Sequence, residues 1–327
     1  MSQNTIVLVS RNAVDYLFAE QVAKNLGVRF TQAESKDQLH DILCANLGCF
    51  ILWDYDSVLE KRPEDARLNS DLVAYFEKHR VWHRVFAISS HPLRDSIVPG
   101  NFHLFSKYLL RNFSLEATKV YSYIIQNILL PNPFEIHAAG IDDLQIQKSR
   151  ITNSARKKAT LEALSIILEK KTIPKRIASS IIRATDELIL NAVFDAPVDL
   201  KGKRYRHSLD RGEEFDLSRK EEVEIELISA QNFLQISVTD YFGSLKKEDF
   251  IPLLAKNFSK QDVAGDDESA KADSGLGLYQ ILNSGLSLQV AIEEGKRTRL
   301  SLVVPWVANV RELRDSFRFF CLRLKTN

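Results

Sequence analysis

The sequence contains few cysteines and almost no net charge, and each of these features excludes some classes of protein. Three cysteines occur in 327 residues, Cys44, Cys49 and Cys321, with no CxxC pair and no Cys/His spacing typical of metal ligands. A disulfide framework and a zinc site are therefore not expected, and the thiols should be reduced. The 44 Lys and Arg residues nearly balance 43 Asp and Glu residues, so no overall charge favours direct nucleic-acid binding or an anionic membrane.

Long apolar runs are also absent. No stretch approaches the ~18 consecutive apolar residues of a membrane helix, and residues 1–5 do not begin an export signal. We therefore expect a cytoplasmic protein that does not span a membrane. Its length of 327 residues and its 45% apolar content fit two globular domains on the usual prior of about 150 residues each.

Residues 1–130 alternate short apolar runs with amphipathic segments. The runs lie at 6–9, 28–31, 49–53, 84–88 and 102–105, and a helix over about 115–130 closes the region. Apolar strands separated by helices form parallel sheets that are covered on both faces, so a doubly wound α/β domain is predicted. Pro131 and Pro133 cannot continue the helix and mark the start of a linker, residues 131–150.

Residues 151–307 follow a different pattern. Two helices, over about 153–170 and from Pro174 onward, precede alternating strands at 223–227, 234–238, 286–292 and 299–304. Strands that alternate in this way favour an antiparallel sheet with one helix-covered face, so an α+β domain, a two-layer α/β sandwich, is predicted. Residues 308–327 carry apolar residues at helical spacing and are predicted to form an amphipathic helix, with homodimerisation as an alternative to packing on the chain itself.

Three short motifs in the second domain together indicate a nucleotide site. Glu187 and Asn191 lie one helical turn apart, where an amide oxygen suits Mg²⁺ and a carboxylate can orient an attacking hydroxyl. Asp240 follows an apolar strand, where its carboxylate can accept a hydrogen bond from adenine, and Gly243 permits close backbone approach. Taken singly, the same residues more often form a solvated helix face or a turn.

Glycines form the third motif. Gly275 and Gly277 stand at the start of a predicted helix, where backbone N–H groups and the helix dipole favour phosphate oxygens. They do not follow a parallel strand, so neither a Rossmann site nor a Walker site is predicted. The polar segment 257–273 before them is interpreted as a lid over the nucleotide, with a plain loop as the alternative.

The three motifs resemble a known family. The segments ELILNA at 187–192, VTDYFG at 238–243 and SGLGLY at 274–279 resemble the N, G1 and G2 boxes of the ATPase superfamily that contains gyrase, histidine kinases and heat-shock ATPase chaperones. Within it, the GLGLY form is most similar to bacterial anti-sigma-factor serine kinases. The resemblance covers about residues 150–305 and implies an ATP-binding signalling regulator, a protein serine/threonine kinase of anti-sigma-factor type, with ATP and Mg²⁺ as cofactors.

The resemblance also implies a role for each motif residue. Asn191 would coordinate Mg²⁺, Glu187 would be the catalytic carboxylate and Asp240 would bind adenine. The remaining residues implied in cofactor binding are Gly243, Ser274, Gly275, Leu276 and Gly277. The implied partner is a protein: a sigma factor, an anti-sigma antagonist or another regulator.

One motif departs from the family, and other functions stay open. The family commonly has Asp-x-Gly-x-Gly, whereas Phe242 and Ser244 stand at the two glycine positions here. A partner-binding module without turnover is therefore the second interpretation, and an ATP-driven clamp without an obvious transducer domain is the third. His137 is followed by no acidic residue, so histidine autophosphorylation is not expected.

Residues 5–130 resemble a response-regulator receiver. The resemblance implies Asp54 as phosphoacceptor, Ser89 or Ser90 as switch hydroxyl, and Lys107 as the phosphate-binding lysine after the fifth strand. Ser10 and Arg11 occupy the positions where receivers carry acidic Mg²⁺ ligands. An inactive pseudo-receiver used for protein contacts is predicted, in which Arg11 could pair with Asp54.

A basic segment separates the first two motifs of the second domain. Its five basic residues are Lys201, Lys203, Arg204, Arg206 and Arg211. We interpret the segment as a solvated loop, with a grip on phosphate or on an acidic partner as the alternative.

Overall fold

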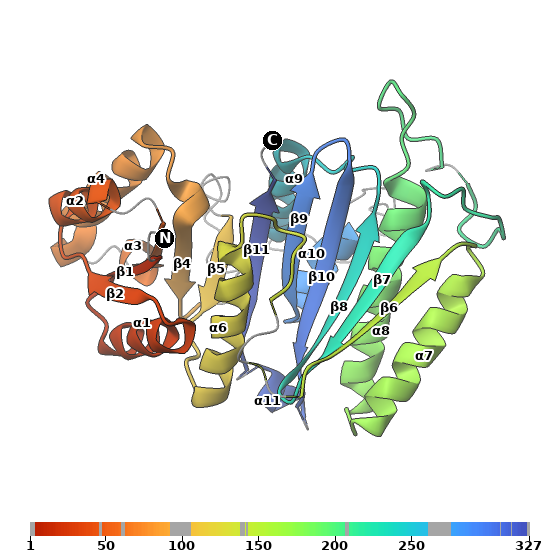
Figure 1. Cartoon of the computed structure of the whole chain (residues 1–327), viewed down its shortest axis with the longest axis horizontal. Helices are drawn as coiled ribbons and strands as arrows, with labels where there is room; N and C mark the ends of the chain where they lie inside the picture. Colours follow the sequence, from red (N-terminus) through yellow and green to blue (C-terminus); the bar gives the residue numbers. More distant parts are fainter. Residues whose placement is uncertain are drawn as a thin grey trace. The chain divides into compact units, whose positions relative to one another are not determined.

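A computed structural model of the chain shows a mixed α/β fold. It describes residues 4–45, 48–59, 63–91, 106–137, 141, 143–206, 209–260, 276–307, 309–314 and 316–325. The chain divides into two compact units, Met1–Leu129 with Phe317–Cys321, and Leu130–Ser316 with Leu322–Asn327 (Figure 1). None of the described helices is long and apolar enough to cross a membrane.

The first unit contains a parallel sheet with strand order β2-β1-β3-β4-β5. The strands are β1 (Thr5–Val9), β2 (Arg29–Gln32), β3 (Cys49–Asp54), β4 (Val85–Ser89) and β5 (Lys107–Leu110). All residues of β1, β3, β4 and β5 are buried. For β1, β3 and β4 this burial agrees with the continuous apolar runs of the sequence. The predicted fifth strand at 102–105 lies outside the described residues, and the described one is β5.

The helices of the first unit connect these strands. They are α1 (Ala13–Leu26), α2 (Lys36–Ala45), α3 (Asp56–Leu59), α4 (Pro63–Lys78), α6 (Leu115–Leu129) and the 3₁₀-helix η1 (Trp82–Arg84). α1 starts after Asn12, whose side chain accepts a hydrogen bond from the N–H of Val14 at 2.9 Å, and ends at Gly27 with φ of 63°. Local capping therefore sets both ends of this helix.

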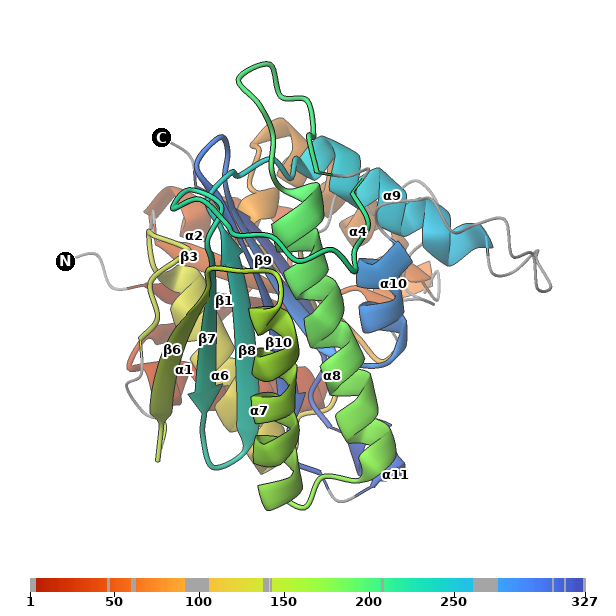
Figure 2. The same ribbon diagram turned by 90° about the vertical axis from the view of Figure 1, so that its right-hand side faces the viewer.

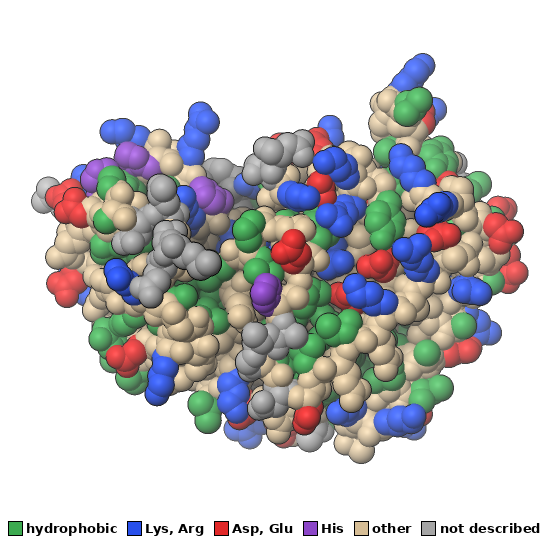
Figure 3. All heavy atoms as spheres, viewed as in Figure 1, with side chains coloured by type: hydrophobic (Ala, Val, Ile, Leu, Met, Phe, Trp, Pro, Cys, Tyr) green, Lys and Arg blue, Asp and Glu red, His purple; other side chains and the backbone are tan. Residues whose placement is uncertain are grey.

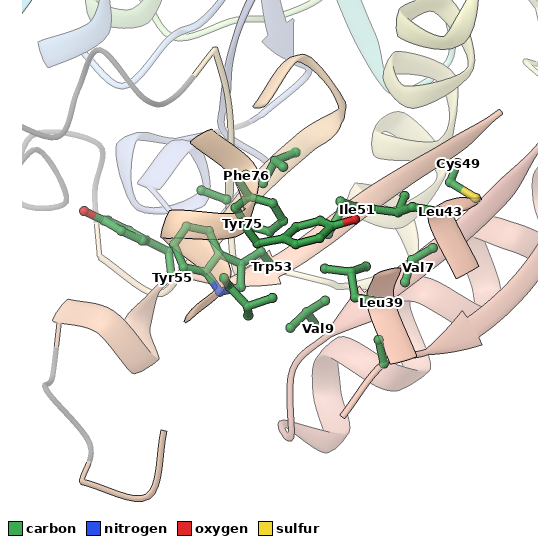
Figure 4. Packing of buried hydrophobic residues seen from close by; sticks show 14 residues of the cluster. Val7, Val9, Leu39, Leu43, Cys49, Ile51, Trp53, Tyr55, Tyr75 and Phe76 are labelled. Carbon is green, nitrogen blue, oxygen red and sulfur yellow. The ribbon is translucent and has the colours of Figure 1, made fainter. Parts of the chain in front are cut away.

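An apolar cluster packs α2 and α4 against strands β1 and β3 (Figure 4). Trp53 of β3 lies edge-on to Phe76 of α4, with ring centroids 5.6 Å apart. Cys49 is buried in the same cluster, and burial raises the pKa of its thiol. All three cysteines are free, as their spacing predicts.

The second unit contains an antiparallel sheet with strand order β9-β10-β8-β7-β6. The strands are β6 (Gln145–Ile151), β7 (Val223–Ser229), β8 (Phe233–Asp240), β9 (Ser287–Glu293) and β10 (Arg297–Pro305). The helices are α7 (Arg156–Lys170), α8 (Lys175–Leu190), α9 (Lys247–Lys260) and α10 (Leu276–Asn283), with a π-helix at Asn191–Asp195. Both predicted antiparallel pairs are present, and α7, α8 and α10 lie on one face of the sheet (Figure 2).

The opposite face of this sheet is polar. Lys148 of β6 pairs with Glu226 of β7 at 2.7 Å, and Arg150 pairs with Glu222 at 3.2 Å. Figure 3 shows basic and acidic side chains mixed over this face. The local mixture agrees with the nearly balanced charge of the whole chain.

The predicted C-terminal amphipathic helix over 308–327 is wrong. The structure has a short helix, α11 (Val310–Arg314), followed by a strand, β11 (Phe319–Leu324). In the first unit, Phe319–Cys321 pairs antiparallel with β5, with Phe319 opposite Leu109. Residues 319–322 form a continuous buried apolar run, and such a short run favours strand as readily as helix by pattern alone. Pairing with the open edge of β5 therefore favours a strand over a helix for these residues.

A glycine turn joins β8 to the hairpin of β9 and β10. Gly243 has φ of +59°, and a Cβ there would lie 2.3 Å from the carbonyl oxygen of Glu293 and 2.7 Å from the N atoms of Lys296 and Arg297. The N–H of Gly295 donates to the carbonyl of Gly243 at 3.0 Å. The close backbone approach predicted for Gly243 is therefore present, and it is made to the β9–β10 turn.

Replacing Gly243→Ala should destabilise the protein by about 3 kcal/mol or more, because left-handed backbone costs about 1–2 kcal/mol and the methyl group also meets backbone atoms. Gly202→Ala is the matched control: its φ is +78°, but no atom lies within 4 Å of the added Cβ. The control should cost about 1 kcal/mol. Urea unfolding of the full chain measures both, and equal losses would contradict the packing argument.

Candidate functional site

A small cavity in the second unit brings the predicted motifs together. Its volume is about 110 Å³, and its apolar walls come from Leu188, Ala192, Val238, Phe250, Leu278 and Leu300. Its polar lining comes from Asn191, Asp195, Arg204, Asp240, Ser244, Asp249 and Thr298. An engineered cavity of about 150 Å³ admits benzene, so this somewhat smaller cavity is close to the size of one aromatic ring. Apolar walls with a few convergent polar groups are typical of ligand pockets.

Asp240 is the buried carboxylate of this cavity. Its Oδ1 accepts hydrogen bonds from the backbone N–H groups of Phe242 at 2.9 Å and Gly243 at 3.1 Å. Burial raises the pKa of Asp240 to about 6, although these two N–H groups act in the opposite direction. The turn thus fixes the carboxyl group in a buried position where its ionised form is unfavourable. The same group lines the cavity, where a ligand can contact it.

Thr298 faces Asp240 across the β8–β10 pair. Its buried hydroxyl and its backbone N–H both lie close enough to the carboxylate to lower the pKa of Asp240. A polar ligand atom at this position could contact the hydroxyl and the carboxylate together. Sequence reasoning missed Thr298, because its relation to Asp240 depends on the strand register.

Asn191 and Glu187 occupy the end of α8. The apolar stripe of this helix is buried at Ile181 and Leu188, which leaves Glu187 directed away from the sheet. Asn191 opens the π-helix and lines the cavity. Short π-helical segments inside α-helices frequently mark functional sites.

Glu187 lies directly against the glycine motif. A Cβ on Gly277 would lie 2.0 Å from Oε1 of Glu187, so only glycine at this position admits the carboxylate where it is. Burial raises the pKa of Glu187, and the positive charge of Arg211 opposes this rise. Leu276 begins α10, whereas Ser274 and Gly275 lie outside the described residues, as does most of the predicted lid at 257–273.

Phe242, the departure from the family pattern, does not line the cavity. Its buried ring lies 6.5 Å from the ring of Tyr205, with the Lys220 ammonium 5.0 Å above it. Ser244, at the other replaced glycine, donates a hydrogen bond to the carbonyl of Ala196 at 2.8 Å and so connects the β8 turn to the end of the π-helix. Phe242 therefore supports the site from outside, whereas Ser244 is part of the cavity lining.

The basic segment is only partly a solvated loop. Lys201 and Lys203 are exposed, as that interpretation predicts. Arg204 is exposed as well, but it also lines the cavity, and Nη2 of Arg211 lies 3.8 Å from Asp195. The spacing of these residues gave no signal that two of them reach the site.

In the first unit, Arg111 forms an ion pair with Asp54, the predicted phosphoacceptor. Arg111 contacts Asp54 at 2.6 Å, Asp15 at 2.7 Å and also Asp56. Burial lowers the pKa of Arg111, but the bonds and charges of Asp15 and Asp54 outweigh it and raise that pKa. No group of three or more His, Cys, Asp or Glu side chains among the described residues is placed to hold a metal ion.

The other predicted receiver residues have different partners. Ser89 donates to Asp56, which is also bonded by the N–H of Ser90 at 2.8 Å. Burial raises the pKa of Asp56, but these hydrogen bonds and the charge of Arg111 outweigh it and lower that pKa. The prediction that Lys107 follows the fifth strand is wrong, because Lys107 begins β5 and Arg111 follows it. Sequence reasoning missed Arg111 because it placed the strand five residues too early.

No family model matches the chain, and no curated protein matches it. Among solved structures, the chain is similar to the crystal structure of SiaB-SiaC complex from Pseudomonas aeruginosa. The similarity has 17% sequence identity and a TM-score of 0.28, and covers 48% of this chain and 88% of that chain. A TM-score this low says nothing about function, so the function is inferred from the geometry of the cavity and the residues around it.

Replacing Asp240→Asn should raise stability at pH 7.5 by up to about 3 kcal/mol, since its pKa rises from 3.8 to about 6 on folding and each unit is worth about 1.4 kcal/mol. The folded state holds this proton more tightly than the unfolded state, so wild-type stability is lost as the pH rises through about 6. Asn avoids that loss. Urea unfolding at pH 7.5 and 4.0 should show the advantage only at the higher pH; the same difference at both would contradict it.

Replacing Arg111→Ala should destabilise the first unit by about 3–5 kcal/mol, because it leaves buried carboxylates without their cation. The matched control is Lys119→Ala, which breaks an exposed pair with Glu116 and should cost under about 0.5 kcal/mol. Thermal unfolding followed by circular dichroism compares the two variants. Similar small losses in both would show that Arg111 does not hold the cluster.

Proposed function

We propose that the second unit binds ATP with Mg²⁺ and is a protein serine/threonine kinase of the anti-sigma-factor type, in a signalling regulator with an inactive pseudo-receiver. The observation that carries the proposal is the pair formed by Asp240 and Thr298 in an apolar cavity whose rim includes Asn191. The motif resemblance found in the sequence supports the same assignment.

Adenine suits the buried end of the cavity. Its exocyclic amine donates a hydrogen bond that the Asp240 carboxylate can accept, and its ring nitrogens accept one that the buried Thr298 hydroxyl can donate. Leu188, Val238 and Leu300 supply apolar surface for the flat faces of a base. Phe242 leaves this space open, which supports binding despite the altered motif.

Asn191 suits the metal. Mg²⁺ keeps several waters and takes one or two protein oxygens together with substrate phosphates, so one amide oxygen at the cavity is a sufficient protein contribution. Bound with ATP, the ion would offset phosphate charge. Asn191, the first residue of the π-helix, would therefore supply the protein oxygen that binds the metal.

Glu187 suits the role of catalytic carboxylate. Its pKa is raised by burial, which makes it a better proton acceptor than an exposed glutamate. It lies one helical turn before Asn191 and against Gly277, so its position is defined by two motifs at once. We propose that it orients and deprotonates a serine or threonine hydroxyl of the partner protein.

The first unit suits a constitutive protein-contact module. Arg111 pairs with Asp54 and with two further carboxylates, so the predicted phosphoacceptor already has a cationic partner inside the unit. We propose that it regulates the kinase unit without accepting phosphate. The chain would thus act on a protein partner such as a sigma factor or its antagonist.

Replacing Glu187→Gln should leave Mg-ATP affinity within about threefold and reduce phosphoryl transfer at least about 100-fold, because Gln keeps the shape and loses the base. Calorimetry measures binding, and transfer from radiolabelled ATP to co-purifying proteins measures turnover. Absence of ATP binding by the wild type with Mg²⁺ present would overturn the proposal. Binding without transfer by the wild type would instead favour the non-catalytic partner-binding module.

A further inference from the structure

A tight hairpin follows the π-helix and carries part of the basic segment. Val198 and Arg204 form an antiparallel bridge. Oδ1 of Asp199 accepts hydrogen bonds from the N–H groups of Lys201 at 2.8 Å and Lys203 at 2.9 Å. The backbone N–H of Asp199 also donates to the carbonyl of Lys203 at 3.0 Å. These local bonds define the conformation of the hairpin by itself.

The end of the hairpin is anchored by its neighbours. The hydroxyl of Tyr205 donates to Glu221 at 2.7 Å, and Arg206 pairs with the same carboxylate at 2.9 Å. The Arg206 guanidinium also stacks over the ring of Phe215, 4.5 Å from its centre. The residue before this anchor, Arg204, is therefore held at a defined position beside the cavity.

Arg204 differs from the other arginines of the segment. Arg206 pairs with Glu221, and Arg211 lies near Asp195, whereas the Arg204 side chain has no ion pair or hydrogen bond with any described residue. The remaining charged side chains that line the cavity are the carboxylates of Asp195, Asp240 and Asp249. Among the described residues that line the cavity, Arg204 is therefore the cationic side chain that an anionic ligand would meet.

We propose that Arg204 binds the phosphate chain of the nucleotide, from outside the three motifs. The inference rests on the proposed function. The hairpin begins two residues after the π-helix that Asn191 opens, so the backbone brings Arg204 to the same cavity as the proposed metal ligand. A guanidinium offers paired N–H donors that match phosphate oxygens, and it strengthens binding in proportion to the phosphate charge that it contacts.

The test compares Arg204→Ala and Arg204→Lys with Lys203→Ala, which removes a neighbouring exposed cation of the same hairpin that does not line the cavity. Calorimetry with Mg-ATP, Mg-ADP and adenosine measures each affinity. Arg204→Ala should weaken ATP binding about 10- to 50-fold and adenosine binding less than about twofold, since charged hydrogen bonds are worth about 10- to 100-fold. Arg204→Lys should lie between, and Lys203→Ala should match the wild type.

Two results would overturn the inference alone: an unchanged ATP affinity in Arg204→Ala, or equal losses for ATP and adenosine, which would indicate a structural role. Binding of none of the three ligands by the wild type would overturn the proposed function together with this inference. Raising the salt concentration should also weaken ATP binding more in the wild type than in Arg204→Ala, because the guanidinium contact is screened.

Discussion

The second unit depends on the burial of one carboxylate, Asp240, at the end of β8. The carboxylate accepts hydrogen bonds from two backbone N–H groups of the turn that follows, and these bonds lower the free-energy cost of its burial. That turn needs Gly243, because no side chain fits between it and the β9–β10 hairpin. The residual free-energy cost is visible in the raised pKa of Asp240. Groups held at such a cost in a cavity are typical of ligand sites.

The two units treat buried carboxylates in opposite ways. In the first, Asp15, Asp54 and Asp56 each form an ion pair with Arg111, so each of these carboxylates has a cationic partner within the unit. In the second, Asp240 accepts hydrogen bonds from two backbone N–H groups and has no ion pair with any described residue, and Arg204 lines the same cavity. The difference in internal pairing is the physical reason for assigning ligand chemistry to one unit and a scaffold role to the other.

Predictions from residue patterns were correct for those elements whose structure is set by local interactions. Alternation of apolar residues predicted the antiparallel pairs, and continuous apolar runs predicted the parallel strands. Pattern reasoning failed for the segment that became β11, because helical spacing and a buried strand were both compatible with the same residues. It misplaced Lys107 for a related reason: a strand boundary shifted by a few residues changes which side chain follows the strand.

By itself the sequence determined most of the elements, β5 and β11 excepted, and the motif residues, since propensity, periodicity and glycine positions act locally. Tertiary structure alone decided which residues meet. Thr298 faces Asp240 only through strand register, Gly277 contacts Glu187 only through packing of α10 on α8, and Arg204 reaches the cavity only through the fold of its hairpin. These contacts join residues that are distant along the chain, and a side chain's partners across such distances are set by packing and register.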